Sequence, residues 1–188
     1  MNYFNISNSS IQPESCGVYS ISLMVLYISS TLYHSFFALR YTRYIFESLD
    51  HCAIYILIAG TYTPIFSIAL DNGKTSLYMV CLIWLCCILG IYVEIVHTTW
   101  EYKSKFSLSM YVGMGWACVV GVPRLMEVLP IESIHLIFLG GIAYMGGIPF
   151  FVRNNELDHS IWHLFVLAGS VLHWLCVYWY VAPMNAML

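Results

Sequence analysis

The chain alternates long apolar runs with short polar breaks. Each run has about the 20 residues that a helix needs to cross the hydrocarbon core of a bilayer. The breaks fall at RYTR (40–43), DNGK (71–74), WEYKSK (100–105), PRLMEVLPIES (123–133) and RNNELD (153–158). The pattern therefore predicts six membrane-spanning helices, over residues 17–39, 50–70, 75–97, 106–123, 133–152 and 159–182.

The apolar runs are continuous and do not alternate between apolar and polar positions. A transmembrane β-barrel requires that alternation, so the pattern disfavours a barrel. The expected fold class is all-α, a polytopic transmembrane helical bundle. Its transmembrane domain covers residues 17–182, after a polar N-terminal segment at 1–16 and before a short C-terminal tail at 183–188.

Composition supports a membrane location. Of 188 residues, 60% are hydrophobic and only 9% are charged, whereas soluble domains carry about a quarter charged residues. The net charge is −3 and the few basic residues are scattered, so the chain has no electrostatic footprint for nucleic acid. We expect an integral multi-pass protein of a plasma membrane or bacterial inner membrane, whose partners are membrane lipids.

The basic residues between the runs are unevenly divided between the two sides of the membrane. One side has five of them, Arg40, Arg43, Lys103, Lys105 and Arg153, and the other side has Lys74 and Arg124. The richer side is expected to face the cytoplasm. With an even number of spans, both termini then lie on the opposite face, which epitope tags at the two ends can check.

Small residues recur inside two of the predicted spans. Gly113, Ala117 and Gly121 are spaced four apart, and residues 140–147 read GGIAYMGG. Small side chains let helices approach closely in lipid. These stretches predict close helix packing within the bundle, or local flexibility at the glycine-rich run.

Ionisable side chains inside membrane spans are costly and commonly functional. Ser30 and His34 are four residues apart and share one helix face, as do His159 and His163. His34 precedes Arg40 by six residues, which places it about 9 Å inside the cytoplasmic edge. Asp50 begins the second predicted span on that side, so these groups from three helices are expected at similar depth.

Three imidazoles at one depth suit a zinc ion. Zn²⁺ binds histidine nitrogen, and three protein ligands leave a fourth position for water, as in catalytic zinc sites. His34, His159 and His163 are therefore the predicted ligands. Asp50 could accept a hydrogen bond from the water, and Ser30 could orient the water or Asp50.

The remaining histidines fit this set less well. His173 lies about 15 Å beyond His163 along the helix, so it is expected to be a packed imidazole. His51 points about 100° away from Asp50, and His135 is expected at the opposite face. The alternative ligand pair is Glu94 and His97, three residues apart at the cytoplasmic end of the third span.

Three stretches of the sequence resemble the haemolysin III family, relatives of the adiponectin and progestin receptors. They are SSTLYHSFF (29–37), LDHCAIYILIAGTYTPI (49–65) and HSIWHLFVLAGSVLHW (159–174). The resemblance implies a helical bundle with zinc near the cytoplasmic face, held by His34, His159 and His163, with Asp50 and Ser30 supporting the water. Family members usually have seven spans, so this sequence is either truncated at its start or a six-span variant. A bundle left open where the first helix would lie is expected either to act alone or to pair with a copy of itself as a homo-oligomer.

Three functions are compatible with these features. The first is a zinc-dependent hydrolase of lipid amides or esters, because related receptors are similarly linked to ceramide hydrolysis. The second is a non-enzymatic receptor or lipid-homeostasis sensor whose zinc is structural. The third is the membrane-damaging cytolysin that the family name implies. No span carries a polar stripe along its full length, which argues against a pore.

Overall fold

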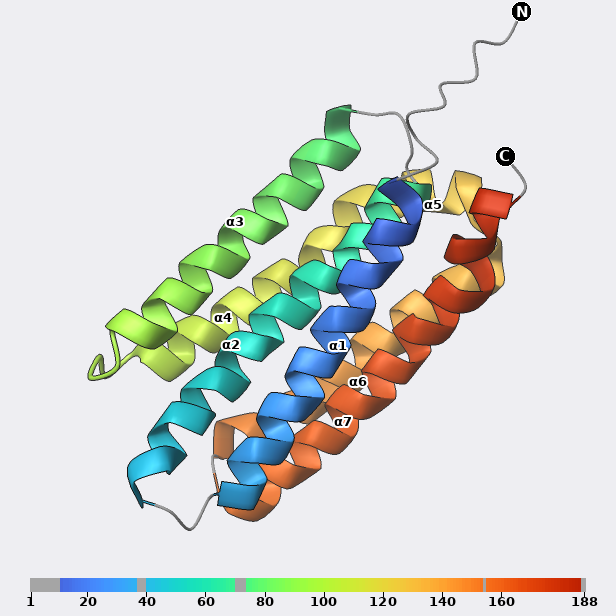
Figure 1. Cartoon of the computed structure of the whole chain (residues 1–188). Coiled ribbons are helices and arrows are strands. Elements are labelled where there is room, and N and C mark those ends of the chain that lie inside the picture. The colour runs from blue at the N-terminus through green and yellow to red at the C-terminus, as the bar shows by residue number, and fades with distance from the viewer. Residues whose placement is uncertain (1–10, 37–39, 70–73, 154, 187–188) are drawn as a thin grey trace, which may run out of the picture. The chain divides into compact units, whose positions relative to one another are not determined.

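The computed structural model describes residues 11–36, 40–69, 74–153 and 155–186. Every element among these residues is a helix (Figure 1). Six helical stretches are long and apolar enough to cross a membrane, namely Glu14–Phe36, Thr42–Ala69, Lys74–Val96, Lys103–Val128, Ile131–Arg153 and Leu157–Met184. The all-α fold class and the six spans are thus confirmed for the described part of the chain.

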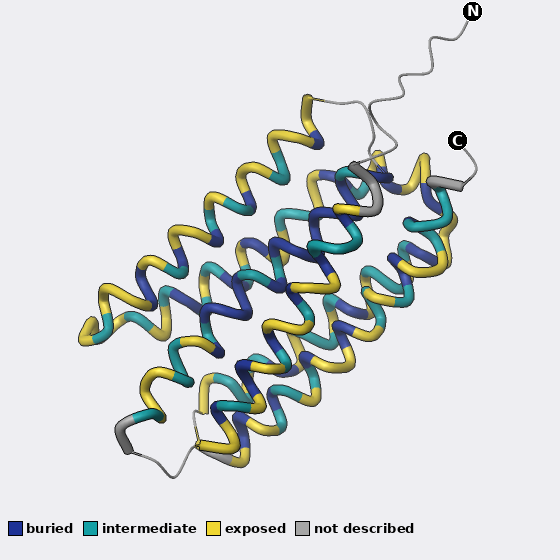
Figure 2. Tube along the Cα trace, viewed as in Figure 1, coloured by how far each residue is buried: buried dark blue, intermediate teal, exposed yellow. Residues whose placement is uncertain are grey.

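The helices form two compact units, Met1–Val120 and Gly121–Leu188, each of which is described by itself. The first unit is built around α2, which packs against α1, α3 and α4. Within the span that contains α2, 83% of the most apolar window is buried, against 28% for α3 (Figure 2). The elements are α1 (Ile11–Phe36), α2 (Arg40–Pro64) with the π-helical turn η1 (Ile65–Ala69), α3 (Lys74–Val96), α4 (Lys103–Trp116) and the 3-10 turn η2 (Ala117–Gly121).

Helix α2 begins ten residues earlier than the predicted span. Its first turns contain Arg40, Arg43 and Glu47, which are too polar for the hydrocarbon core but include no glycine or proline to stop a helix. Hydropathy marks where the apolar run starts, and the helix extends beyond it. Asp50 therefore lies in the interior of α2 and is fully buried, not at a helix N-terminus where the dipole would favour its charge.

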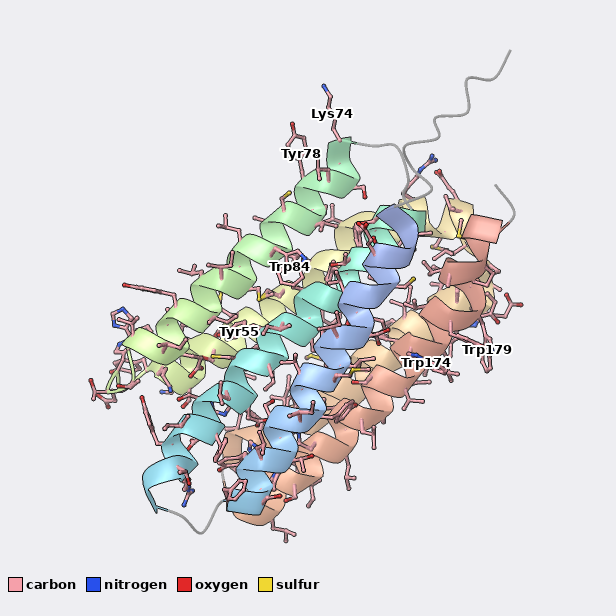
Figure 3. The ribbon with its side chains drawn as sticks, in the orientation of Figure 1. Tyr55, Lys74, Tyr78, Trp84, Trp174 and Trp179 are labelled. Atoms are coloured by element: carbon pink, nitrogen blue, oxygen red, sulfur yellow. The ribbon has the colours of Figure 1, made fainter. Side chains whose placement is uncertain are left out.

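The AGTYTP stretch near the end of α2 contacts each of the other long helices of the unit. The Tyr62 hydroxyl donates to the Met114 carbonyl oxygen of α4 at 2.6 Å. The Trp84 indole of α3 donates to the Thr63 hydroxyl at 3.1 Å (Figure 3). A Cβ at Gly60 would overlap the Ser22 side chain of α1, so the missing side chain lets the two helices pack closely there. The stretch thus fixes α2 among its three neighbours.

A second close approach, at Gly90 of α3, gives a stability prediction. A Cβ atom at Gly90 would overlap the ring of Tyr55, which is fully buried. Gly90→Ala is therefore expected to destabilise the protein by about 1–3 kcal/mol, the usual cost of overpacking. Gly113→Ala is the matched control, because a Cβ there meets no described atom within 4 Å. Thermal unfolding in detergent should show a lower midpoint for Gly90→Ala and an unchanged or higher one for Gly113→Ala.

The second unit pairs α6 and α7 side by side (Figure 1). Glycines of the GGIAYMGG stretch lie in this interface. A Cβ at Gly140 would overlap the ring of His173, and one at Gly147 would lie 2.6 Å from Trp162. The predicted packing role of the stretch is confirmed at these two positions. The elements are α5 (Val122–Val128), α6 (Ile131–Arg153), α7 (Glu156–Cys176), the π-helical turn η3 (Val177–Val181) and the 3-10 turn η4 (Ala182–Ala186).

Many large apolar side chains lie on the outside of both units. Tyr78 of α3 is 68% exposed and Trp179 of η3 is 55% exposed, and Figure 3 shows both pointing away from their helices. Soluble monomers rarely expose large contiguous apolar patches, whereas helices in lipid do so over their whole outer face. The exposure pattern agrees with a multi-pass integral membrane protein.

Candidate functional site

The start of α7 presents two histidines as a pair. The Nε2 atoms of His159 and His163 lie 3.0 Å apart, and the two rings meet edge to face with centroids 4.7 Å apart. His159 is buried and His163 is half-buried. The predicted four-residue spacing therefore brings both imidazoles to one point of the helix surface.

A helix cap holds this pair in place. The Asn155 side chain accepts a hydrogen bond from the backbone N–H of Asp158 at 2.8 Å and donates to the Asp158 carboxylate at 2.7 Å. The His159 backbone N–H then donates to the Asn155 carbonyl at 2.9 Å. The sequence analysis missed this cap, although an Asn followed three residues later by an acidic residue is a pattern that starts helices.

The spacing of the two nitrogens suits a shared metal ion. Two histidine nitrogens bound tetrahedrally to zinc at about 2.0–2.1 Å are about 3.3 Å apart. The Nε2 atoms of His159 and His163 are already within 0.3 Å of that separation (3.0 Å). A small rotation of either ring would complete the fit, so these two residues can act as adjacent zinc ligands.

The other predicted site residues belong to the first unit. Ser30 and Asp50 are buried, on α1 and α2 respectively, and His34 is exposed near the end of α1. The His34 ring contacts that of Tyr33 edge to face at 5.1 Å. Helices α1 and α2 pack against each other, so these residues lie on neighbouring helices of the unit. The full predicted ligand set takes residues from both units, and it stays a prediction.

The alternative ligand pair is not brought together. The Glu94 carboxylate is fully buried and contacts Lys103 Nζ at 2.8 Å and His51 Nδ1 at 3.7 Å. His97 lies beyond the end of α3, exposed, with its ring near those of Tyr92 and Trp100. The structure therefore favours an ion-paired role for Glu94 over metal binding with His97.

Of two further histidines, His173 agrees with its expected role as a packed imidazole. The His173 ring packs against Gly140 and Tyr144, and its Nε2 donates to the Ile137 carbonyl oxygen at 3.0 Å. It is a packed, hydrogen-bonded imidazole of the α6–α7 interface. His135 of α6 is exposed, which makes it a suitable control position.

Comparison with known proteins places the chain in a family. A family model described as "Haemolysin-III related" matches residues 1–174. The chain is 40% identical to "Hemolysin-3" of Bacillus cereus over 88% of this chain and 74% of that protein. It is 37% identical to the "Hemolysin-3 homolog" of Bacillus subtilis (strain 168), over 87% of this chain and 75% of that protein.

A mammalian protein also matches. The human "Monocyte to macrophage differentiation factor" is 28% identical, over 87% of this chain and 68% of its own length. Together, the family model and the bacterial relatives show that the chain belongs to the haemolysin III-related family.

Proposed function

We propose that this protein is a zinc-dependent hydrolase of lipid amides or esters. The observation that carries the proposal is the His159–His163 pair, whose Nε2 atoms lie 3.0 Å apart at the start of a membrane-spanning helix. At that separation one ring can donate an N–H to the other, and the spacing of adjacent zinc ligands, about 3.3 Å, is only about 0.3 Å wider.

His34 is the proposed third ligand. It shares the four-residue motif with Ser30 on α1, and its side chain is exposed. Three histidine ligands leave one coordination position open, which distinguishes catalytic zinc sites from closed structural ones. When bound, zinc would act as a Lewis acid and lower the pKa of a coordinated water to about 7.

Asp50 is the proposed general base. A carboxylate inside a membrane span costs about 2.5–3.5 kcal/mol on insertion scales, yet Asp50 is fully buried in α2. Its carboxylate would take the proton of the attacking water and return it to the leaving amine or alcohol. Ser30, also buried, would orient the water or the Asp50 carboxylate through its hydroxyl.

Lipids are the proposed substrate class. The residues of the site belong to helices that cross the membrane, and the expected depth is close to the cytoplasmic headgroups. An amide or ester bond of a membrane lipid lies at that depth. The resemblance to receptors linked to ceramide hydrolysis supports an amide such as ceramide.

The direct test is lipid turnover by the purified protein in detergent or liposomes. We expect zinc in the purified protein and hydrolysis within a panel of ceramides, lysolipids and ester lipids. Chelation should abolish turnover and added zinc should restore it. Zinc without hydrolysis across the panel would instead favour a receptor or sensor with a structural metal.

A cytolysin is the second candidate, favoured by the name of the Bacillus cereus relative. A pore requires a polar lining through the membrane, yet the charged cluster at Glu94 lies at one end of α3. Dye release from liposomes distinguishes the two functions. Release that is independent of zinc would favour the cytolysin over the hydrolase.

A further inference from the structure

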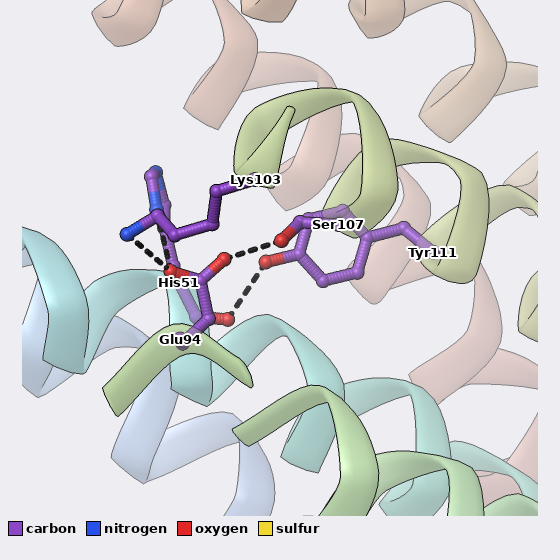
Figure 4. Close-up of polar contacts among 5 residues, drawn as sticks. All are labelled: His51, Glu94, Lys103, Ser107 and Tyr111. Carbon is purple, nitrogen blue, oxygen red and sulfur yellow. Dashed lines mark hydrogen bonds and ion pairs between the residues drawn. The ribbon is translucent and has the colours of Figure 1, made fainter. Parts of the chain in front are cut away.

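A polar cluster joins three helices of the first unit at His51, the residue that follows Asp50 in α2 (Figure 4). At its centre is Glu94 of α3, whose side chain is fully buried. From α4, Lys103 Nζ lies 2.8 Å from one carboxylate oxygen and the Ser107 hydroxyl donates to the other. From α2, His51 Nδ1 lies 3.7 Å away. The carboxylate therefore joins α3 to α4, with His51 of α2 close beside it.

A second set of contacts holds the same turn of α2. The Tyr111 hydroxyl of α4 donates to the backbone carbonyl oxygen of His51 at 2.9 Å. The ring of Tyr111 packs on that of Tyr55 with centroids 4.5 Å apart, and Tyr55 in turn fills the space left by Gly90 of α3. Residues 51–55 of α2 are thus held from two neighbouring helices by side chains and by the backbone.

We infer that Glu94 and Tyr111 are positioning residues, which fix the rotation of α2 and so set the direction of the Asp50 carboxylate. The inference rests on the proposed function of Asp50. Successive side chains of a helix point about 100° apart. The contacts at His51 therefore fix the rotation of α2 about its axis, and the side chain of the neighbouring Asp50 leaves the helix about 100° from that of His51.

A positioning role accounts for the Glu94 cluster better than a contribution to folding stability does. A buried ion pair is often no better for folding than well-packed apolar side chains. A rigid polar contact does, however, define a single helix orientation. Misplacing a catalytic group by about 1 Å can cost roughly a hundredfold in rate, so the direction of Asp50 must be tightly fixed.

The test uses two matched tyrosine variants. Tyr111→Phe removes one hydroxyl that α4 donates to α2 beside Asp50, and Tyr62→Phe removes one hydroxyl that α2 donates to α4 at Met114. Position 62 lies about 18 Å along the helix from Asp50. We expect Tyr111→Phe to lower kcat about 10- to 100-fold with KM and zinc content unchanged, and Tyr62→Phe to leave kcat unchanged.

Hydrogen exchange supplies a readout that does not depend on activity. The amides of residues 50–56 should exchange about two- to tenfold faster in Tyr111→Phe, the usual worth of one hydrogen bond, and at the unmutated rate in Tyr62→Phe. Glu94→Gln, which keeps the shape but removes the charge opposite Lys103, should show both the exchange and the kcat effects.

The outcomes separate this inference from the proposed function. If the unmutated protein hydrolyses lipid and both tyrosine variants keep equal kcat and equal exchange, the positioning role is overturned and the hydrolase stands. If the unmutated protein hydrolyses nothing in the panel, the hydrolase fails, and with it the catalytic purpose of the cluster. In that case, faster exchange in Tyr111→Phe but not in Tyr62→Phe would still show that the hydrogen bond from Tyr111 to His51 holds this turn of α2.

Discussion

Purified His159→Ala and His163→Ala variants are expected to lose most of their bound zinc. Each change removes one of two nitrogens that lie 3.0 Å apart, and a ligand is worth at least the 10- to 100-fold in affinity that outer-shell partners contribute. His34→Ala should lose zinc to the same extent if His34 is the third ligand. The measurement is metal content per chain after dialysis against a weak chelator.

His135→Ala is the control for these variants. His135 is exposed on α6, in the same unit as the pair, and should retain the full zinc content. Full zinc content in His34→Ala would remove that residue from the ligand set. Loss of zinc in Glu94→Gln, with His34→Ala unaffected, would instead favour the alternative that includes Glu94.

The span count and the pairing of histidines could be predicted from sequence, because both depend on distances along one helix. Apolar runs report which residues can lie in lipid, and a separation of four residues brings His159 and His163 to one face whatever the rest of the chain does. The structure confirms the six spans among the described residues. The predicted start of α2 is wrong, because the helix begins at Arg40, ten residues before the apolar run begins.

The Glu94 cluster could not be predicted in the same way. Its members come from α2, α3 and α4, and no spacing along the chain indicates that Glu94 meets Lys103 and His51. Along the chain, the neighbour of Glu94 with the most suitable spacing is His97, which suggested a metal pair. Helix packing decides whether Glu94 meets His97 or meets Lys103 and His51. The close approach of Tyr55 to Gly90 is part of that packing.

The cluster and the histidine pair use polar side chains in different ways. The charges of Glu94 and Lys103 offset each other at 2.8 Å, so this contact needs no ligand. The facing nitrogens of His159 and His163 belong to two side chains of the same kind, and their 3.0 Å separation is close to that of adjacent zinc ligands. This difference is why the metal is proposed at the histidines, while the carboxylate cluster is assigned a positioning role.

The Asp50→Asn variant is expected to retain zinc and lose hydrolysis. Asparagine keeps the shape of the buried side chain in α2 but cannot take a proton from water. Turnover should fall by about 10² to 10⁴, the usual worth of general acid–base assistance. The measurement is the steady-state rate on whichever lipid the unmutated protein hydrolyses, with zinc content determined on the same preparation.

Glu47→Gln is the matched control, because Glu47 is an acidic residue one turn earlier on the same helix and only half-buried. It should keep both zinc and turnover. If Asp50→Asn hydrolyses lipid at the rate of the unmutated protein, Asp50 is not the base, and another group must take the proton. If Asp50→Asn loses zinc as well as activity, its carboxylate contributes to metal binding, and the division between three ligands and one base has to be redrawn.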